Sequence, residues 1–202
     1  FPTNKMNAPN DQSTIVSAAD AREFPPFSLK RLLGSVFTPT EGMKVCVLID
    51  LENLHDVTDF AFLEDDSLAI QRKAYEVFYR GLHDGVMEAL GMLGGEFYAY
   101  HISGGSNLDL RDEAVQSTGR EVSLEKDVYP NYDIILCIST FSATAPLTAL
   151  AKQHHFRGAT LHGLNEVIIN SGLSVDYRDV SEDAEKLRLA LTRADTIEID
   201  FS

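Results

Sequence analysis

The feature that most constrains the fold is an unbroken apolar run at residues 45–49, which ends abruptly at Asp50. A strand with one exposed face alternates apolar and polar residues, but this run contains no polar position. Both of its faces must therefore be covered, as they are in a central strand of a parallel sheet. Residues 134–138 form a second run of the same kind, which ends at Ser139.

The segments around these two runs predict the other elements. Three further strands are expected: residues 96–101 nearer an edge of the sheet, the short segment 158–161, and residues 196–201. Helical spacing predicts four helices, at residues 27–33, 67–90, 144–154 and 179–194. Gly34 is expected to end the first helix, and Asp179 with Glu182 has the spacing of a capping box that begins the last. Alternating strands and helices predict an α/β fold with an open, mostly parallel sheet and helices on both faces, a Rossmann-like layering.

Length and charge limit the domain organisation and the partners. A chain of 202 residues suits one good-sized domain. Residues 1–26 are rich in Asn, Pro, Ser, Ala and Asp without a steady period, which predicts a flexible extension before an α/β domain at residues 27–202. The chain has 17 Lys and Arg against 31 Asp and Glu, a formal charge of −14. Such a charge repels phosphate backbones and anionic lipids, so neither nucleic acid nor membrane is expected as a partner.

The two cysteines and the absence of long apolar stretches bear on location. Cys46 and Cys137 lie inside the apolar runs, which favours buried thiols over a disulfide and fits a reducing compartment. The sequence has no stretch of about 18 or more apolar residues, and it does not begin with the pattern of a signal peptide. A cytoplasmic location is therefore expected.

Candidate site residues follow the strands, because ligands of open α/β sheets bind beyond the carboxyl ends of the strands. Asp50, Glu52 and Asp56 follow the first run, and their carboxylates could hold Mg²⁺. The alternative is an acidic loop in which Asp50 accepts hydrogen bonds from neighbouring backbone. The sequence is compatible with both the Mg²⁺ site and the acidic loop.

Hydroxyl and imidazole groups follow the later strands. Ser139 and Ser142 precede the helix at 144–154, where they could bind an anion or cap the helix. Residues 101–107 are rich in glycine and serine and could form an anion-binding nest or a plain loop. His162 follows the strand at 158–161 without the spacing of zinc ligands, which favours a structural or surface histidine.

Several segments of the C-terminal third keep a characteristic order and spacing. They are residues 132–142, the R-G-A-T-x-x-G-x-N-E segment at 157–166, Asp176 with Tyr177, and residues 184–195. Together they resemble the thermophilic metallo-aminopeptidase family, whose relatives include 2,5-dihydroxypyridine dioxygenase. The resemblance implies an N-terminal scaffold domain that walls the substrate chamber, is catalytically silent alone and could form a homodimer. It also implies that a divalent metal belongs to a C-terminal domain of the same protein, with no catalytic residue, metal ligand or cofactor in this chain.

Residues 45–54, VCVLIDLENL, resemble a second family, the NYN/PIN-like ribonucleases. In that family an I-D-G-x-N-L motif supplies a metal-binding Asp, which would be Asp50, while Leu51 replaces the usual Gly. The later S-x-D-x-D motif of the family would begin at Ser139, where the sequence has no carboxylate. The alternatives to a scaffold domain are therefore a Mg²⁺- or Mn²⁺-dependent ribonuclease that uses Asp50, and a module that binds a small anion.

Overall fold

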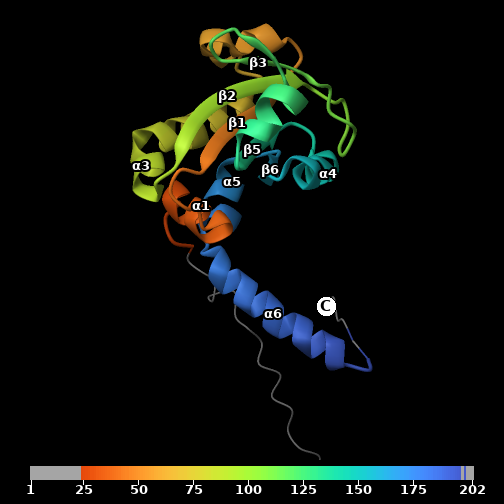
Figure 1. The fold of residues 1–202 in the computed structure, drawn as a ribbon. Helices are drawn as coiled ribbons and strands as arrows, with labels where there is room; N and C mark the ends of the chain where they lie inside the picture. The colour runs from red at the N-terminus through yellow and green to blue at the C-terminus, as the bar shows by residue number, and fades with distance from the viewer. Residues whose placement is uncertain (1–23, 197, 199–202) are drawn as a thin grey trace, which may run out of the picture.

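A six-stranded sheet forms the centre of the computed structural model, which describes residues 24–196 and 198 (Figure 1). The strand order is β4-β3-β2-β1-β5-β6. Four neighbouring strands are parallel: β2 (Leu93–His101), β1 (Lys44–Leu51), β5 (Ile134–Ser139) and β6 (Arg157–His162). Two short strands form an antiparallel hairpin beside β2: β3 (Glu113–Gln116) and β4 (Glu121–Ser123). The predicted α/β fold with an open, mostly parallel sheet is confirmed.

Helical segments connect the strands. Before β2 they are α1 (Leu29–Phe37), η2 (Leu54–Glu64), α2 (Ala69–Lys73), η3 (Ala74–Tyr79), η4 (Leu82–Val86) and α3 (Met87–Leu90). After β4 they are η5 (Leu124–Val128), η6 (Tyr129–Asn131), α4 (Thr144–His154), α5 (Glu166–Ile169), η7 (Gly172–Ser174) and α6 (Tyr177–Arg193). Among the described residues, no helix is both long and apolar enough to cross a lipid bilayer.

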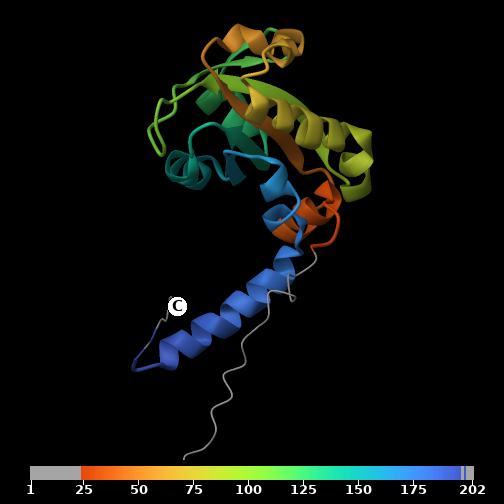
Figure 2. The same cartoon turned by 180° about the vertical axis from the view of Figure 1, so that it is seen from behind.

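The central strand β1 is covered on both faces, as its unbroken apolar run predicts. Val45, Val47 and Ile49 belong to a core that includes side chains of α1, η3 and η4. Cys46 and Leu48 belong to a second core, which includes side chains of η5 and α4. Figures 1 and 2 show these helices on opposite sides of the sheet. The two cores hold the carboxyl ends of the parallel strands in a fixed arrangement, and the candidate site lies there.

One strand prediction differs from the structure, one hairpin was not predicted, and one predicted strand lies mainly outside the described residues. The strand predicted at residues 96–101 is not near an edge, because β2 pairs with β1 on one side and with β3 on the other. The β3–β4 hairpin escaped prediction because its strands have only 4 and 3 residues. The strand predicted at 196–201 falls mainly on residues 197 and 199–201, which lie outside the described residues, and Thr196 and Glu198 have no regular structure.

The predicted end of the first helix is wrong. α1 continues through Gly34, which faces Leu90 of α3, to Phe37. Ser28 caps its start by accepting the N–H of Arg31, and Thr38 ends the helix in the left-handed conformation. Helix termini depend on such local hydrogen bonds, so a glycine in the sequence does not by itself mark the end.

The predicted capping box of the last helix is also wrong. α6 begins at Tyr177, and its cap is Asp176, whose carboxylate accepts the N–H of Arg178. Asp179 therefore lies inside the first turn, where its charge complements the positive end of the helix dipole. In contrast, the prediction for residues 144–154 agrees with the bounds of α4, and Pro146 stands in its first turn.

Candidate functional site

The topological switch point of the sheet lies between β1 and β5. The chain leaves β1 towards β2 on one side, whereas β5 pairs with the opposite side of β1 and leads outwards to β6. Ligands of open α/β sheets bind at such a point, beyond the carboxyl ends of the strands. Asp50 near the end of β1 and Ser139 at the end of β5 lie at this edge, followed by Thr140.

Asp50 accepts hydrogen bonds from both sides of the switch point. The backbone N–H of Thr140 lies 2.9 Å from each carboxylate oxygen, and the Thr140 hydroxyl donates to Oδ1 at 3.2 Å. The amide of Gln71 in α2 donates to the same Oδ1 at 2.7 Å, and it also lies 3.0 Å from both the Asp50 carbonyl and the Thr140 hydroxyl. We call these three residues the Asp50 network. The Asp50 carboxylate thus accepts hydrogen bonds from groups of the protein itself.

Burial decides the electrostatic character of Asp50, which is only 1% exposed. Loss of water contact raises the pKa of its carboxyl group above the usual 3.8, and the bonds from Thr140 and Gln71 only partly counter this shift. The site therefore disfavours the charged carboxylate. A metal ligand must be deprotonated and must direct lone pairs at the ion, so both the donors and the burial oppose metal binding by Asp50.

A cavity of about 420 Å³ opens beside the Asp50 network, with Glu52, Asp56 and Asp65 among its lining residues. Asp56 accepts a hydrogen bond of 2.7 Å from Asn53, and Asp65 accepts two from Ser67. Within residues 24–196 and 198, no three His, Cys, Asp or Glu side chains form a group that could hold a metal ion. The structure thus brings Asp50, Glu52 and Asp56 to one cavity, where Asp50 and Asp56 accept hydrogen bonds from neighbouring groups.

Ser139 at the end of β5 and Ser142 in the turn after it serve the local fold. The Ser139 hydroxyl donates to the Phe141 carbonyl at 2.6 Å, and its side chain is buried. Ser142 is joined to Asn107, whose N–H donates to the Ser142 carbonyl at 2.6 Å. The Asn107 side-chain oxygen in turn accepts the N–H of Ala145 at 3.0 Å. The anion position predicted at the start of α4 is therefore filled by an amide oxygen from another loop.

His162 does not join the Asp50 network. It ends β6, pairs in register with Ser139 and is exposed. Strand β5 lies between β1, which carries Asp50, and β6, which carries His162. The surface position agrees with the structural alternative for this histidine.

The two thiols are buried and unbridged, as their apolar surroundings predict. Burial raises the pKa of Cys137 to about 12 and that of Cys46 well above its usual value. Both thiols therefore stay protonated at neutral pH, and neither is an activated nucleophile.

A larger cleft, of about 650 Å³, lies beside β2 and the β3–β4 hairpin. Apolar residues contribute to its lining: Leu54, Ala114, Val115 and Val122. Its polar lining includes five carboxylates and two imidazoles: Glu52, Asp112, Glu113, Glu121 and Asp127, with His55 and His101. Ser123 is hydrogen-bonded to two of these carboxylates: its hydroxyl donates to Asp112 at 2.7 Å, and its N–H donates to Asp127 at 2.9 Å. We call this feature the acidic cleft.

Sequence reasoning missed Gln71 and the acidic cleft. Gln71 has a detectable signal, because it is a polar residue in helical register with Ala74 and Phe78, which are both fully buried. Such a position predicts a buried polar group that needs a partner. The cleft has no comparable signal, because its walls come from a hairpin that the sequence does not reveal.

Comparisons with known protein families, with curated proteins and with solved structures found no match. The local chemistry of the switch point and of the acidic cleft must therefore support any functional assignment. The switch point has a buried carboxylate that accepts hydrogen bonds from Thr140 and Gln71, and the cleft has exposed carboxylates beside apolar side chains.

Proposed function

We propose that this chain is an NYN/PIN-like domain that has lost the cleavage centre and acts as a non-catalytic binding domain. The Asp50 network is the observation that carries the proposal. Asp50 and Thr140 are 90 positions apart, yet they are hydrogen-bonded at the switch point. This is the juxtaposition expected if the I-D-x-x-N-L segment and the segment that begins at Ser139 correspond to the two acidic motifs of that family.

The same juxtaposition explains why cleavage is not expected. Counted from Ser139, an S-x-D-x-D motif would place its carboxylates at positions occupied here by Phe141 and Ala143. Metal-assisted phosphodiester cleavage needs acidic ligands that clamp the ion over the phosphate. Asp50 instead accepts hydrogen bonds from Thr140 and Gln71.

The resemblance to the N-terminal domain of metallo-aminopeptidase-like proteins stays a second prediction. It agrees with the first proposal that this domain has no cleavage centre of its own. The two differ in the expected partner. For the metallo-aminopeptidase-like domain, the partner would be a C-terminal metal domain of the same protein. A cytoplasmic location and a homodimer also stay predictions.

The acidic cleft indicates the chemistry of the ligand. Glu52, Glu113 and Glu121 are exposed at its rim, and the imidazole of His55 lies 3.5 Å from Glu121. A cleft of one charge sign concentrates ions of the opposite sign, so a cation fits better than the small anion considered from the sequence. Lys and Arg side chains suit both parts of the cleft, because their stems pack on apolar surface and their charged ends reach carboxylates. We therefore propose a Lys- and Arg-rich segment of a partner polypeptide as the ligand.

A peptide-binding measurement tests the cleft. A fluorescent peptide that alternates Lys or Arg with Leu should raise its anisotropy on addition of the protein, and the same peptide with Glu should not. The double substitution Glu113→Gln and Glu121→Gln should weaken binding, since it removes two rim charges, whereas Glu182→Gln on exposed α6 is the matched control. Equal binding by both variants would exclude the acidic cleft as the site.

A thermal-shift measurement tests the switch point separately. A metal that binds the folded state at 100 times its dissociation constant adds about 2.7 kcal/mol of stability. Addition of Mg²⁺ or Mn²⁺ should change the unfolding of the wild type and of Asp50→Asn equally, because Asp50 is not a ligand. A stabilisation that disappears in Asp50→Asn would show that Asp50 binds the metal.

A further inference from the structure

Beyond Tyr177, which packs against the first hydrophobic core, helix α6 has no residue in either core. It projects from the body of the protein in both views, and every residue from Arg178 to Arg193 is exposed (Figures 1 and 2). A single helix of this length is marginally stable in water, and packing of an apolar face is the usual source of its stability. The exposed part of α6 therefore needs an apolar contact that the body does not supply.

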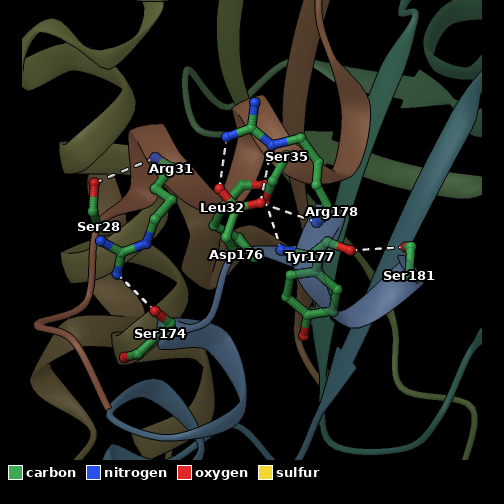
Figure 3. Close-up of polar contacts among 9 residues, drawn as sticks. All are labelled: Ser28, Arg31, Leu32, Ser35, Ser174, Asp176, Tyr177, Arg178 and Ser181. Carbon is green, nitrogen blue, oxygen red and sulfur yellow. Dashed lines mark hydrogen bonds and ion pairs between the residues drawn. The ribbon is translucent and has the colours of Figure 1, made fainter. Parts of the chain in front are cut away.

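The first turn of α6 is tied to α1 (Figure 3). The N–H of Tyr177 donates to the Ser35 hydroxyl at 3.3 Å, and the Arg31 guanidinium donates to the Ser174 carbonyl at 2.7 Å. Asp176 caps the helix and also accepts two bonds from the Arg178 side chain. These bonds hold the start of α6 and the preceding η7 beside α1.

The apolar residues of α6 form a seam with the spacing of a coiled coil. Val180, Ala184, Leu187 and Leu191 follow one another at intervals of 4, 3 and 4 positions, which is the a and d pattern of a seven-residue repeat. Val180 is 45% exposed, Leu187 60% and Leu191 43%. Leu189 is also exposed, but it lies at the f position, on the side of the helix opposite the seam.

We propose that α6 pairs with α6 of a second copy of this chain as a short, parallel, two-stranded coiled coil. The charged residues beside the seam favour a second copy of the same helix as the partner, and they favour the parallel arrangement. Asp183 is at a g position and Arg188 at the e position of the next repeat. In a parallel pair these positions face each other across the seam, so Asp183 meets Arg188 of the partner subunit on both sides. In an antiparallel pair g faces g and e faces e, which brings like charges together.

Contacts within the single helix do not prevent this pairing. Asp183 accepts a bond of 3.1 Å from Lys186, and Arg188 is paired with Glu185 at 2.6 Å. All four side chains are more than half exposed, and ion pairs of this kind contribute little to stability. Their exchange for contacts between the helices therefore costs little.

The seam is short, so the dimer belongs to the class of small, transient interfaces. It uses neither the Asp50 network nor the acidic cleft. The dimer and the proposed binding function can therefore fail independently of each other.

Sedimentation equilibrium over a wide range of protein concentration tests the dimer. The wild type should pass from monomer to dimer, and Leu187→Glu should raise the dissociation constant at least about tenfold, because it places a charge in the seam. Leu189→Glu is the matched control and should leave the dissociation constant unchanged. Both leucines are exposed in the monomer, and circular dichroism verifies the fold of each variant. A monomer at every concentration, or an equal effect of both substitutions, would overturn the proposal.

Charge reversal tests the direction. Asp183→Arg and Arg188→Asp should each weaken the dimer about tenfold, since each places like charges across the seam on both sides. The two substitutions together should restore the wild-type dissociation constant. Failure of the double variant to restore the dimer would contradict the parallel arrangement.

Discussion

Replacement of Asp50 by Ala tests directly whether this carboxylate has a structural role. The substitution removes the acceptor of the Thr140 N–H and hydroxyl and one acceptor of the Gln71 amide. A buried donor that loses its acceptor costs about 1–3 kcal/mol. Gln71 is buried and keeps two other acceptors, the Asp50 carbonyl and the Thr140 hydroxyl, whereas Thr140 is exposed, so water replaces part of what its N–H and hydroxyl lose.

We expect Asp50→Ala to lower the free energy of unfolding by about 1–3 kcal/mol, an appreciable part of the about 5–15 kcal/mol typical of a domain. The matched control is Asp50→Asn, which keeps one acceptor oxygen and the side-chain volume and should cost less than half as much. Urea unfolding followed by circular dichroism measures both, provided that the slope with urea stays unchanged. A loss below about 0.5 kcal/mol in Asp50→Ala would refute the structural role, because such a value is typical of a surface substitution.

Three further predictions concern pH, the core and the start of α6. Burial raises the pKa of Asp50 above its value in the unfolded chain, so the stabilising contribution of Asp50 is complete below pH 3.8 and is lost as the pH rises through the folded pKa. Urea midpoints should therefore show that the wild type loses stability relative to Asp50→Asn over that pH range. Ile135→Ala removes a fully buried side chain of β5 and should cost about 2–5 kcal/mol in urea unfolding, while Val167→Ala, at an exposed position, should cost little; a small loss for Ile135→Ala would place this side chain outside the core. Arg31→Ala removes the hydrogen bond to the Ser174 carbonyl, so amide hydrogen exchange in the first turn of α6 should accelerate while exchange in β1 stays slow. Unchanged exchange in α6 would show that this bond does not hold the helix.

The parts of the fold that depend on short stretches of sequence could be predicted. The runs at 45–49 and 134–138 are apolar on both faces, and both became central strands. The bounds of α4 were also predicted, because its early proline and its position directly after a strand are local signals. The β3–β4 hairpin could not be predicted, because its strands are short and are stabilised by pairing with β2 rather than by their own composition.

The candidate site could be predicted only in part. The end of a central strand placed Asp50 at the switch point, and the structural alternative anticipated a bond to backbone. The donors themselves come from Gln71, 21 positions away, and Thr140, 90 positions away, and only the packing of α2 and β5 brings them together. The same holds for Asn107, which fills the start of α4 from a loop 38 positions earlier than Ala145.

Incubation of the purified chain with labelled single-stranded RNA and Mn²⁺ or Mg²⁺, beside Asp50→Asn under the same conditions, tests the proposed loss of the cleavage centre most directly. The RNA should stay intact with both proteins, because the Asp50 carboxylate is hydrogen-bonded to Thr140 and Gln71 and positions 141 and 143 carry no acidic residue. Metal-dependent cleavage by the wild type that is absent in Asp50→Asn would show that the switch point is an active nuclease centre.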